Sequence, residues 1–197
     1  MSLAAFKPLV GLTLRDPRAA ARQIMAMDLP RHVSWSALFL AAAVTTLVLQ
    51  VMIGLSPAET RDRLPSYFDA PLAVFLLLAG LMVIYVHAVF WAGRVLSGTG
   101  RLDDLLALMV WLMVLRAGVQ VITLVLTLTL PPLAGLLSIL ALVWAFWILL
   151  SFVAEALVLP SLGHALMALL IGVVGLFLGV GMLLAVILIL AGGAVNV

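Results

Sequence analysis

Three ionisable residues lie inside otherwise apolar stretches of the sequence: His87, Arg116 and Glu155. A charged side chain in hydrocarbon costs roughly 2.5–3.5 kcal/mol on insertion scales, so each such residue needs a partner or a function. A guanidinium and a carboxylate neutralise one another through charge-assisted hydrogen bonds, and a nearby imidazole can join them or take up a proton. These residues therefore form a candidate intramembrane polar cluster.

Different interpretations of this cluster remain open. Arg116 and Glu155 pair in the first and lock two helices together. In the second, the three residues line a proton or ion pathway, although Glu155 is the sole acidic residue at depth. In the third, the residues never meet, because Glu155 is near enough to the membrane surface to reach water.

Other kinds of chemistry find little support in the sequence. Cysteine is absent, which excludes disulfides, thiolate metal sites and a cysteine nucleophile. The three histidines show no i,i+4 spacing to another ligand, and no GxSxG, HExxH or phosphate-binding glycine loop occurs. We therefore expect no catalytic residue, no metal and no cofactor.

The composition indicates where the three polar residues lie. Hydrophobic residues make up 66% of the 197 residues and charged residues 9%, against roughly a quarter in soluble domains. The mean hydropathy is +1.37. A soluble chain of this length cannot cover that much apolar surface, whereas lipid accepts it. No basic stripe exists beyond the first 31 residues, which argues against a nucleic-acid partner.

Long apolar stretches separated by short polar or proline-containing loops predict five transmembrane helices. The predicted spans cover residues 33–55, 71–96, 105–130, 133–159 and 165–191. They predict an all-α integral membrane protein, a bundle of five transmembrane helices with a short amphipathic N-terminal helix. The chain would divide into a cytoplasmic segment, residues 1–31, and a transmembrane domain, residues 32–197.

Arg116 makes the third span ambiguous. A rival interpretation begins this span at Ala117 and makes residues 104–115 an interfacial helix. It would place Pro131 and Pro132 in mid-span, where two adjacent prolines would break the helix. We therefore prefer one long span over residues 105–130.

The distribution of lysine and arginine predicts the orientation of the spans. The side that holds the N-terminus carries seven of these residues: Lys7, Arg15, Arg18, Arg22, Arg31, Arg94 and Arg101. The opposite side carries Arg61 and Arg63. This difference predicts a cytoplasmic N-terminus and, after five spans, a periplasmic C-terminus. At about 1.5 Å per residue, the three polar cluster residues then all lie in the cytoplasmic half.

Asp16 followed by Pro17 is typical of a helix start, with Asp as N-cap and Pro as the first helical residue. A helix over residues 17–27 would place basic residues on one side, namely Arg15, Arg18 and Arg22. These arginines either meet anionic lipid, at about 1 kcal/mol each, or form a docking surface for a cytoplasmic partner.

The last span carries glycines that predict close helix packing, namely Gly172, Gly175 and Gly179. The four-residue spacing of Gly175 and Gly179 allows backbones to approach closely, within the bundle or across a dimer. Gln50 and Gln120, in the outward halves of their spans, are expected to hydrogen-bond between helices.

Two short motifs are similar to a known family. The segment LTLRDPRAAAR, residues 12–22, resembles the entry segment of bacterial Yip-family proteins (Ypt-interacting, Rab-associated), as does the Gly98-Thr99-Gly100 turn before the third span. The order of five spans after a cytoplasmic N-terminus is also similar over nearly the whole chain. The resemblance implies a membrane scaffold or accessory protein. We expect no GTPase-binding role, because residues 1–31 do not match the long N-terminal region of eukaryotic members.

These features together predict a non-enzymatic scaffold or accessory protein of the bacterial inner membrane that acts through its helix faces. The expected partners are membrane lipids and other membrane proteins or a second copy of the chain, with no nucleic acid. The alternative function is a small transporter or channel component that uses His87, Arg116 and Glu155.

Overall fold

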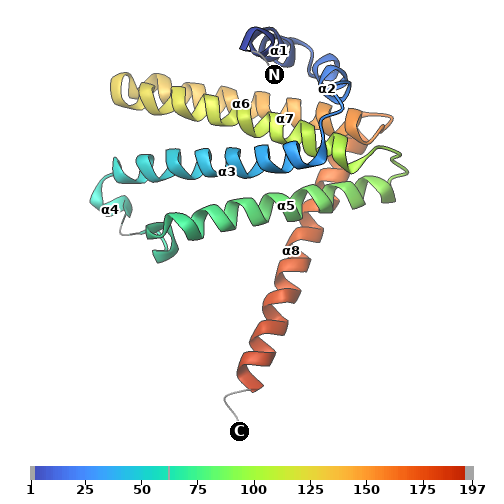
Figure 1. Ribbon diagram of the computed structural model, residues 1–197. Coiled ribbons are helices and arrows are strands. Elements are labelled where there is room, and N and C mark those ends of the chain that lie inside the picture. Colours follow the sequence, from blue (N-terminus) through green and yellow to red (C-terminus); the bar gives the residue numbers. More distant parts are fainter. Residues whose placement is uncertain (1–2, 62, 194–197) are drawn as a thin grey trace.

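The computed structural model describes residues 3–61 and 63–193 of the chain, and every regular element within them is a helix (Figure 1). Five helices are long and apolar enough to cross a membrane: α3 (Arg31–Gly54), α5 (Pro71–Val95), α6 (Leu102–Thr129), α7 (Pro131–Ala156) and α8 (Leu162–Gly193). The shorter elements are α1 (Leu3–Arg15), α2 (Pro17–Met25), α4 (Ala58–Arg61) and the 3-10 helix η1 (Ser66–Asp69). The predicted fold class is therefore confirmed.

Prolines set several of the helix boundaries. Pro17, Pro71 and Pro131 each occupy the first turn of a helix, where a missing amide N–H costs nothing. Helix α6 runs without a break past Arg116, so the rival interpretation of the third span is wrong. Leu130 is the single residue between α6 and α7, which makes this helical hairpin very tight.

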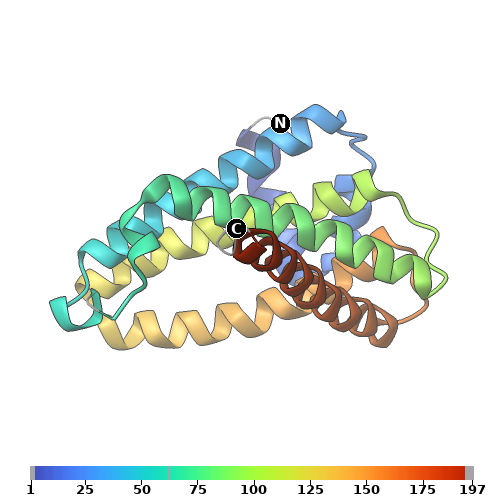
Figure 2. The ribbon, with the colours of Figure 1, turned by 90° about the horizontal axis from the view of Figure 1, so that it is seen from below.

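Four of the long helices lie alongside one another, while α8 crosses α5 and leaves the bundle at a steep angle (Figures 1 and 2). Helices α3 and α6 begin, and α5 and α7 end, at the same end of the bundle. We call it the basic end, because Arg31, Arg94 and Arg101 lie there. The α4–η1 connection and the α6–α7 hairpin form the opposite end (Figure 1).

Packing is uneven along the bundle axis. Buried side chains of α6 gather near its start, from Leu105 to Trp111, and those of α7 gather near its end, from Ile148 to Ala156. The first half of α7 is instead mostly exposed, as Ile139 at 63% and Leu142 at 71% illustrate. The helices are thus tightly packed at the basic end and loosely packed at the opposite end.

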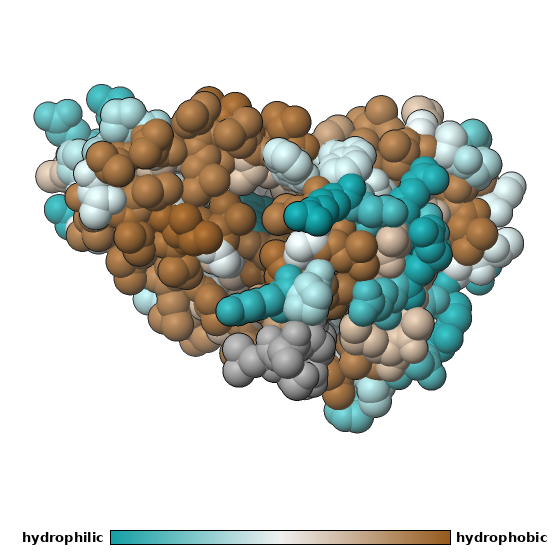
Figure 3. Space-filling view, turned by 90° about the horizontal axis from the view of Figure 1, so that it is seen from above, coloured by the Kyte–Doolittle hydropathy of each residue, from teal (hydrophilic) through white to brown (hydrophobic). Residues whose placement is uncertain are grey.

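The N-terminal helices α1 and α2 form a hairpin that packs on α6 and α7 (Figure 1). The sequence did not predict α1, because Lys7 and Pro8 interrupt its apolar residues and a proline inside a helix removes one hydrogen bond. Helix α2 starts as predicted, since Asp16 Oδ1 accepts a hydrogen bond from Ala19 N at 3.0 Å. Hydrophilic side chains gather over this part of the molecule, and apolar ones cover most of the other half apart from a hydrophilic tip (Figure 3).

Candidate functional site

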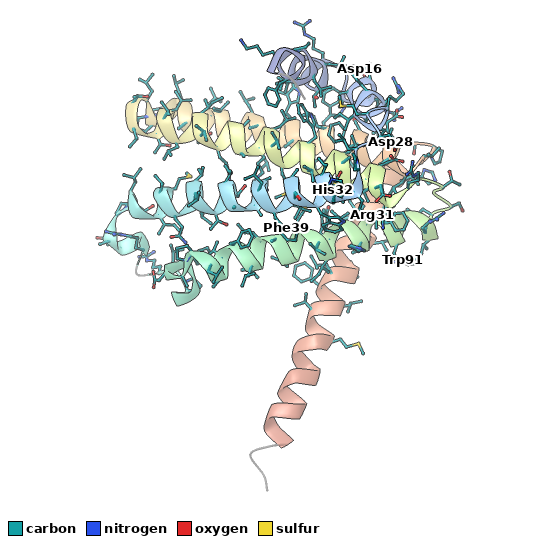
Figure 4. All side chains as sticks on the ribbon, viewed as in Figure 1. Asp16, Asp28, Arg31, His32, Phe39 and Trp91 are labelled. Carbon is teal, nitrogen blue, oxygen red and sulfur yellow. The ribbon has the colours of Figure 1, made fainter. Side chains whose placement is uncertain are left out.

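Ion pairs connect the chain segments that meet at the basic end. Arg31 at the start of α3 forms a bidentate ion pair with Asp103 at the start of α6. Its Nε donates to Oδ1 at 2.7 Å and its Nη2 donates to Oδ2 at 3.0 Å. Arg101 lies 3.8 Å from Asp28 and 4.0 Å from Asp103. Figure 4 shows Asp28 and Arg31 at this end, with Asp16 where α1 meets α2. These pairs fix the entry of α3 relative to the start of α6.

Glu155 joins α7 to the N-terminal hairpin. Its Oε1 accepts a hydrogen bond from Arg22 Nη1 at 3.0 Å, and Arg18 Nε lies 3.9 Å away. In this arrangement Glu155 is therefore bound by arginines of α2 and not by Arg116, and the interpretation in which Arg116 pairs with Glu155 stays a prediction. Their exposed side chains, 45% for Arg18 and 58% for Arg22, keep this contact accessible to water and salt.

Within the described residues, neither His87 nor Arg116 forms a hydrogen bond or ion pair with Glu155. His87 Nδ1–H donates to the carbonyl of Val83 at 2.7 Å, and its ring stacks on Trp35 with centroids 6.1 Å apart. Arg116 is exposed and forms no hydrogen bond or ion pair with a residue in the described ranges. No direct interaction within those ranges therefore connects the three residues, and a functional role for them stays a prediction.

The remaining N-terminal arginine differs from its two neighbours. Arg15 is exposed at the end of α1 and makes no ion pair within the part of the chain that the structure describes. Lipid or partner contact by Arg15, Arg18 and Arg22 was expected, and it stays a prediction for all three.

Two tryptophan side chains, one on α6 and one on α7, donate hydrogen bonds to residues of α1. Trp111 Nε1 donates to Thr13 Oγ1 at 3.0 Å, and the ring of Phe6 meets the Trp111 ring edge-on at 5.3 Å. Trp144 Nε1 donates to the carbonyl oxygen of Leu14 at 3.2 Å. Since Trp111 lies about 14 Å along α6 from Leu102, α1 packs beside the span and not beyond its end.

An apolar cavity of about 420 Å³ lies between this hairpin and the helices α3 and α6. All of its lining residues are apolar: Phe6, Leu9, Ile24, Met27, Leu29, Ala37, Ala107, Val110, Trp111 and Val114. The one polar atom among these side chains, the Trp111 indole nitrogen, already donates to Thr13. The cavity therefore suits hydrocarbon, and its lining side chains offer a polar ligand no free hydrogen-bonding group.

The Gly98-Thr99-Gly100 turn hydrogen-bonds to the end of α7 and packs closely against it. The amides of Thr99 and Gly100 both donate to the carbonyl of Leu157, at 3.1 and 3.4 Å. A Cβ atom on Gly100 would overlap the carbonyl oxygen of Ala156, so this position requires glycine. The turn, which the sequence analysis used only as a family motif, thus has a specific packing role.

The glycines of α8 fall into two groups. A Cβ atom on Gly172 would lie 2.9 Å from a methyl carbon of Val89, so α8 and α5 approach closely at this point. The same atom on Gly175 or Gly179 would meet nothing within 4 Å. Close packing at Gly175 and Gly179, in a dimer for instance, stays a prediction. Within the described residues, no group of three His, Asp or Glu side chains is placed to hold a metal ion.

Five apolar helices of membrane-crossing length, with a helical hairpin fastened to two of them, define a multi-pass helical membrane protein. The sequence model of the Yip1 domain family matches residues 11–183. The chain therefore belongs to the Yip1 domain family, as the motifs at residues 12–22 and 98–100 predicted. Neither the curated proteins nor the solved structures contain a match to this chain.

Proposed function

We propose that the protein is a non-enzymatic scaffold or accessory protein of the bacterial inner membrane that binds membrane-protein partners and lipid through its helix faces. The observation that carries this proposal is the exposed half of α7. Large apolar side chains are exposed around most of its circumference: Leu133, Leu136, Ile139, Leu140, Leu142, Val143, Trp144, Phe146 and Trp147. Membrane helices associate by packing such surfaces, and aromatic residues are frequent anchors in interfaces.

The charged groups at the basic end support the same proposal. Two ion pairs, Arg22 with Glu155 and Arg31 with Asp103, connect helices to one another. These charged groups therefore have a structural role. The alternative of a transporter loses support, because its acidic residue, Glu155, is occupied by Arg22. Arg15 remains exposed and fits a contact with anionic lipid at the surface of the cytoplasmic leaflet.

Photo-crosslinking in native membranes tests this proposal. A photoreactive amino acid at Leu142, which is 71% exposed, should give discrete protein adducts of fixed mass. The unchanged chain, irradiated in the same way, should give none. Adducts to lipid alone at Leu142, Ile139 and Leu136 would show that the exposed half of α7 has no protein partner.

A further inference from the structure

Arg116 lies at the middle of α6, a helix long enough to cross a membrane, and has no partner among the described residues of its own chain. It follows Leu102 by about 21 Å along α6 and precedes Thr129 by about 20 Å. Helix α6 is about 40 Å long and a hydrocarbon core is about 30 Å thick, so Arg116 lies at least about 9 Å from either surface. An extended arginine side chain covers only part of that distance. Residues of this kind normally face protein and pair with another group.

The polar residues of α6 beyond its first turn share one face. Apart from the Trp111 indole, the polar side chains between residues 105 and 128 are Arg116, Gln120, Thr123 and Thr127. Their spacing of i, i+4, i+7 and i+11 places all four within about 60° of one another around the helix. We call this face the polar stripe. The Gln120 side chain is half-buried, and its Oε1 lies inside the bundle without a hydrogen bond to any described residue.

A second copy of this chain cannot neutralise Arg116 at this depth. The sequence has eight Asp and Glu residues, and none lies in 29–58, 70–102, 105–154 or 156–197. Helices α3, α5 and α8 therefore carry no acidic residue, and α6 carries its two in the first turn. Glu155 lies in the last turn of α7, bound to Arg22. The neutralising group must come from another molecule.

We infer that the polar stripe of α6 binds a membrane helix of a different protein, and that this helix carries a carboxylate side chain at the depth of Arg116. Charge complementarity selects this occupant, since a guanidinium in hydrocarbon forms its strongest contact with a carboxylate. Gln120, Thr123 and Thr127 would add hydrogen bonds or close contacts along the same face. The inference rests on the proposed function and names the partner chemistry of one helix face.

A defined peptide tests the inference without a need to know the natural partner. The probe is a leucine-rich membrane helix with one central glutamate, compared with matched helices that carry glutamine or leucine there. The chain has no cysteine, so Arg63→Cys provides a single site for a fluorophore. Energy transfer to labelled peptide in phosphatidylcholine vesicles then gives the affinity. We expect the glutamate helix to bind at least about tenfold more tightly than the leucine helix.

Variants of Arg116 test whether this residue causes the preference for the glutamate helix. Arg116→Leu should abolish it, Arg116→Lys should keep most of it, and Arg116→Glu should transfer it to a lysine-bearing helix. Arg94→Leu, a matched change at the end of α5, should leave it intact. Circular dichroism and a single elution peak confirm that each variant is folded.

Two results would overturn the inference. One is equal binding of the glutamate and leucine helices, and the other is a preference that survives in Arg116→Leu. If Arg116 instead pairs with a lipid phosphate, labelled phosphatidylglycerol will be enriched around the protein in an Arg116-dependent way and no peptide will be preferred. Crosslinking at Leu142 on α7 is a separate measurement, so its outcome distinguishes a failure here from a failure of the proposed function.

Discussion

Val158, two residues after the end of α7, has a φ of 55°, in the left-handed region that a β-branched residue rarely adopts. Its neighbours impose this conformation. The carbonyl of Leu157 accepts hydrogen bonds from Thr99 and Gly100, and the amide of Leu159 donates to Ala154 at 2.8 Å. The turn between α7 and α8 is thus held in place by the contacts on both sides of one strained residue.

Replacing Val158 with glycine should stabilise the protein. Glycine removes a conformational cost of about 1–2 kcal/mol, and the Val158 side chain is 65% exposed, so little packing is lost. We expect a higher midpoint of thermal unfolding in detergent. Leu55→Gly is the matched control, because Leu55 is 56% exposed with a φ of −85°, and it should lower the midpoint. A lower midpoint for Val158→Gly would contradict the assigned strain.

Gly100→Ala should have the opposite effect. The new methyl group would overlap the backbone of Ala156 and Leu157, and overpacking of this kind costs about 1–3 kcal/mol. The unfolding midpoint should fall and the yield of folded protein with it. Gly118→Ala, where a methyl group meets nothing within 4 Å, should be neutral or slightly stabilising in the helix. Equal behaviour of the two variants would refute the packing role of the turn.

At the scale of elements, the sequence predicts the spanning helices well and their contacts poorly. Length, hydropathy and prolines such as Pro71 and Pro131 fix where a helix runs, because these signals are local. They give the depth of Arg116 and Glu155 but not the direction in which each side chain points around its helix. Helix α2, which supplies the partner of Glu155, was predicted from the sequence as an amphipathic helix that contacts lipid or a cytoplasmic partner, and its contact with α7 was not predicted. The contact between them is set by tertiary packing.

A double-mutant cycle separates the two possible partners of Glu155. Arg22→Gln and Glu155→Gln should show a coupling free energy of about 0.5–1 kcal/mol at low salt, reduced at high salt because the arginine is exposed. The cycle of Arg116→Gln with Glu155→Gln should be additive. Both are measured from unfolding of the purified protein in detergent. Coupling in the second cycle and additivity in the first would restore the pair that the sequence predicted.

At the scale of the whole molecule, packing and charge divide the protein along one axis. The buried core and the ion pairs lie at the basic end, while the opposite half exposes apolar helix faces. This arrangement fits a protein that holds itself together at one membrane surface and offers its spans to other molecules. Seven basic residues lie on the N-terminal side and two on the other, which predicts that this surface is the cytoplasmic one.

Accessibility of single cysteines checks this orientation. In cells whose outer membrane has been made permeable, a maleimide reagent that cannot cross the inner membrane should label Arg63→Cys. It should leave Arg15→Cys unlabelled until the inner membrane is opened. Because the natural sequence has no cysteine, the unchanged chain serves as the unlabelled control. Labelling of Arg15→Cys from outside would reverse the proposed topology.

The contact of Arg22 with Glu155 also has a consequence for biosynthesis, because 133 residues separate the two partners in the chain. Ribosomes add about 5–20 residues per second, so roughly 7 to 27 s pass between the synthesis of the two side chains. During that interval α1 and α2 have left the ribosome, while the α7 surface that will receive them does not yet exist. The nascent hairpin must wait with Leu9 and Ile24 against lipid or an insertion factor. The hairpin can therefore dock on α7 only after the synthesis of α7 is complete.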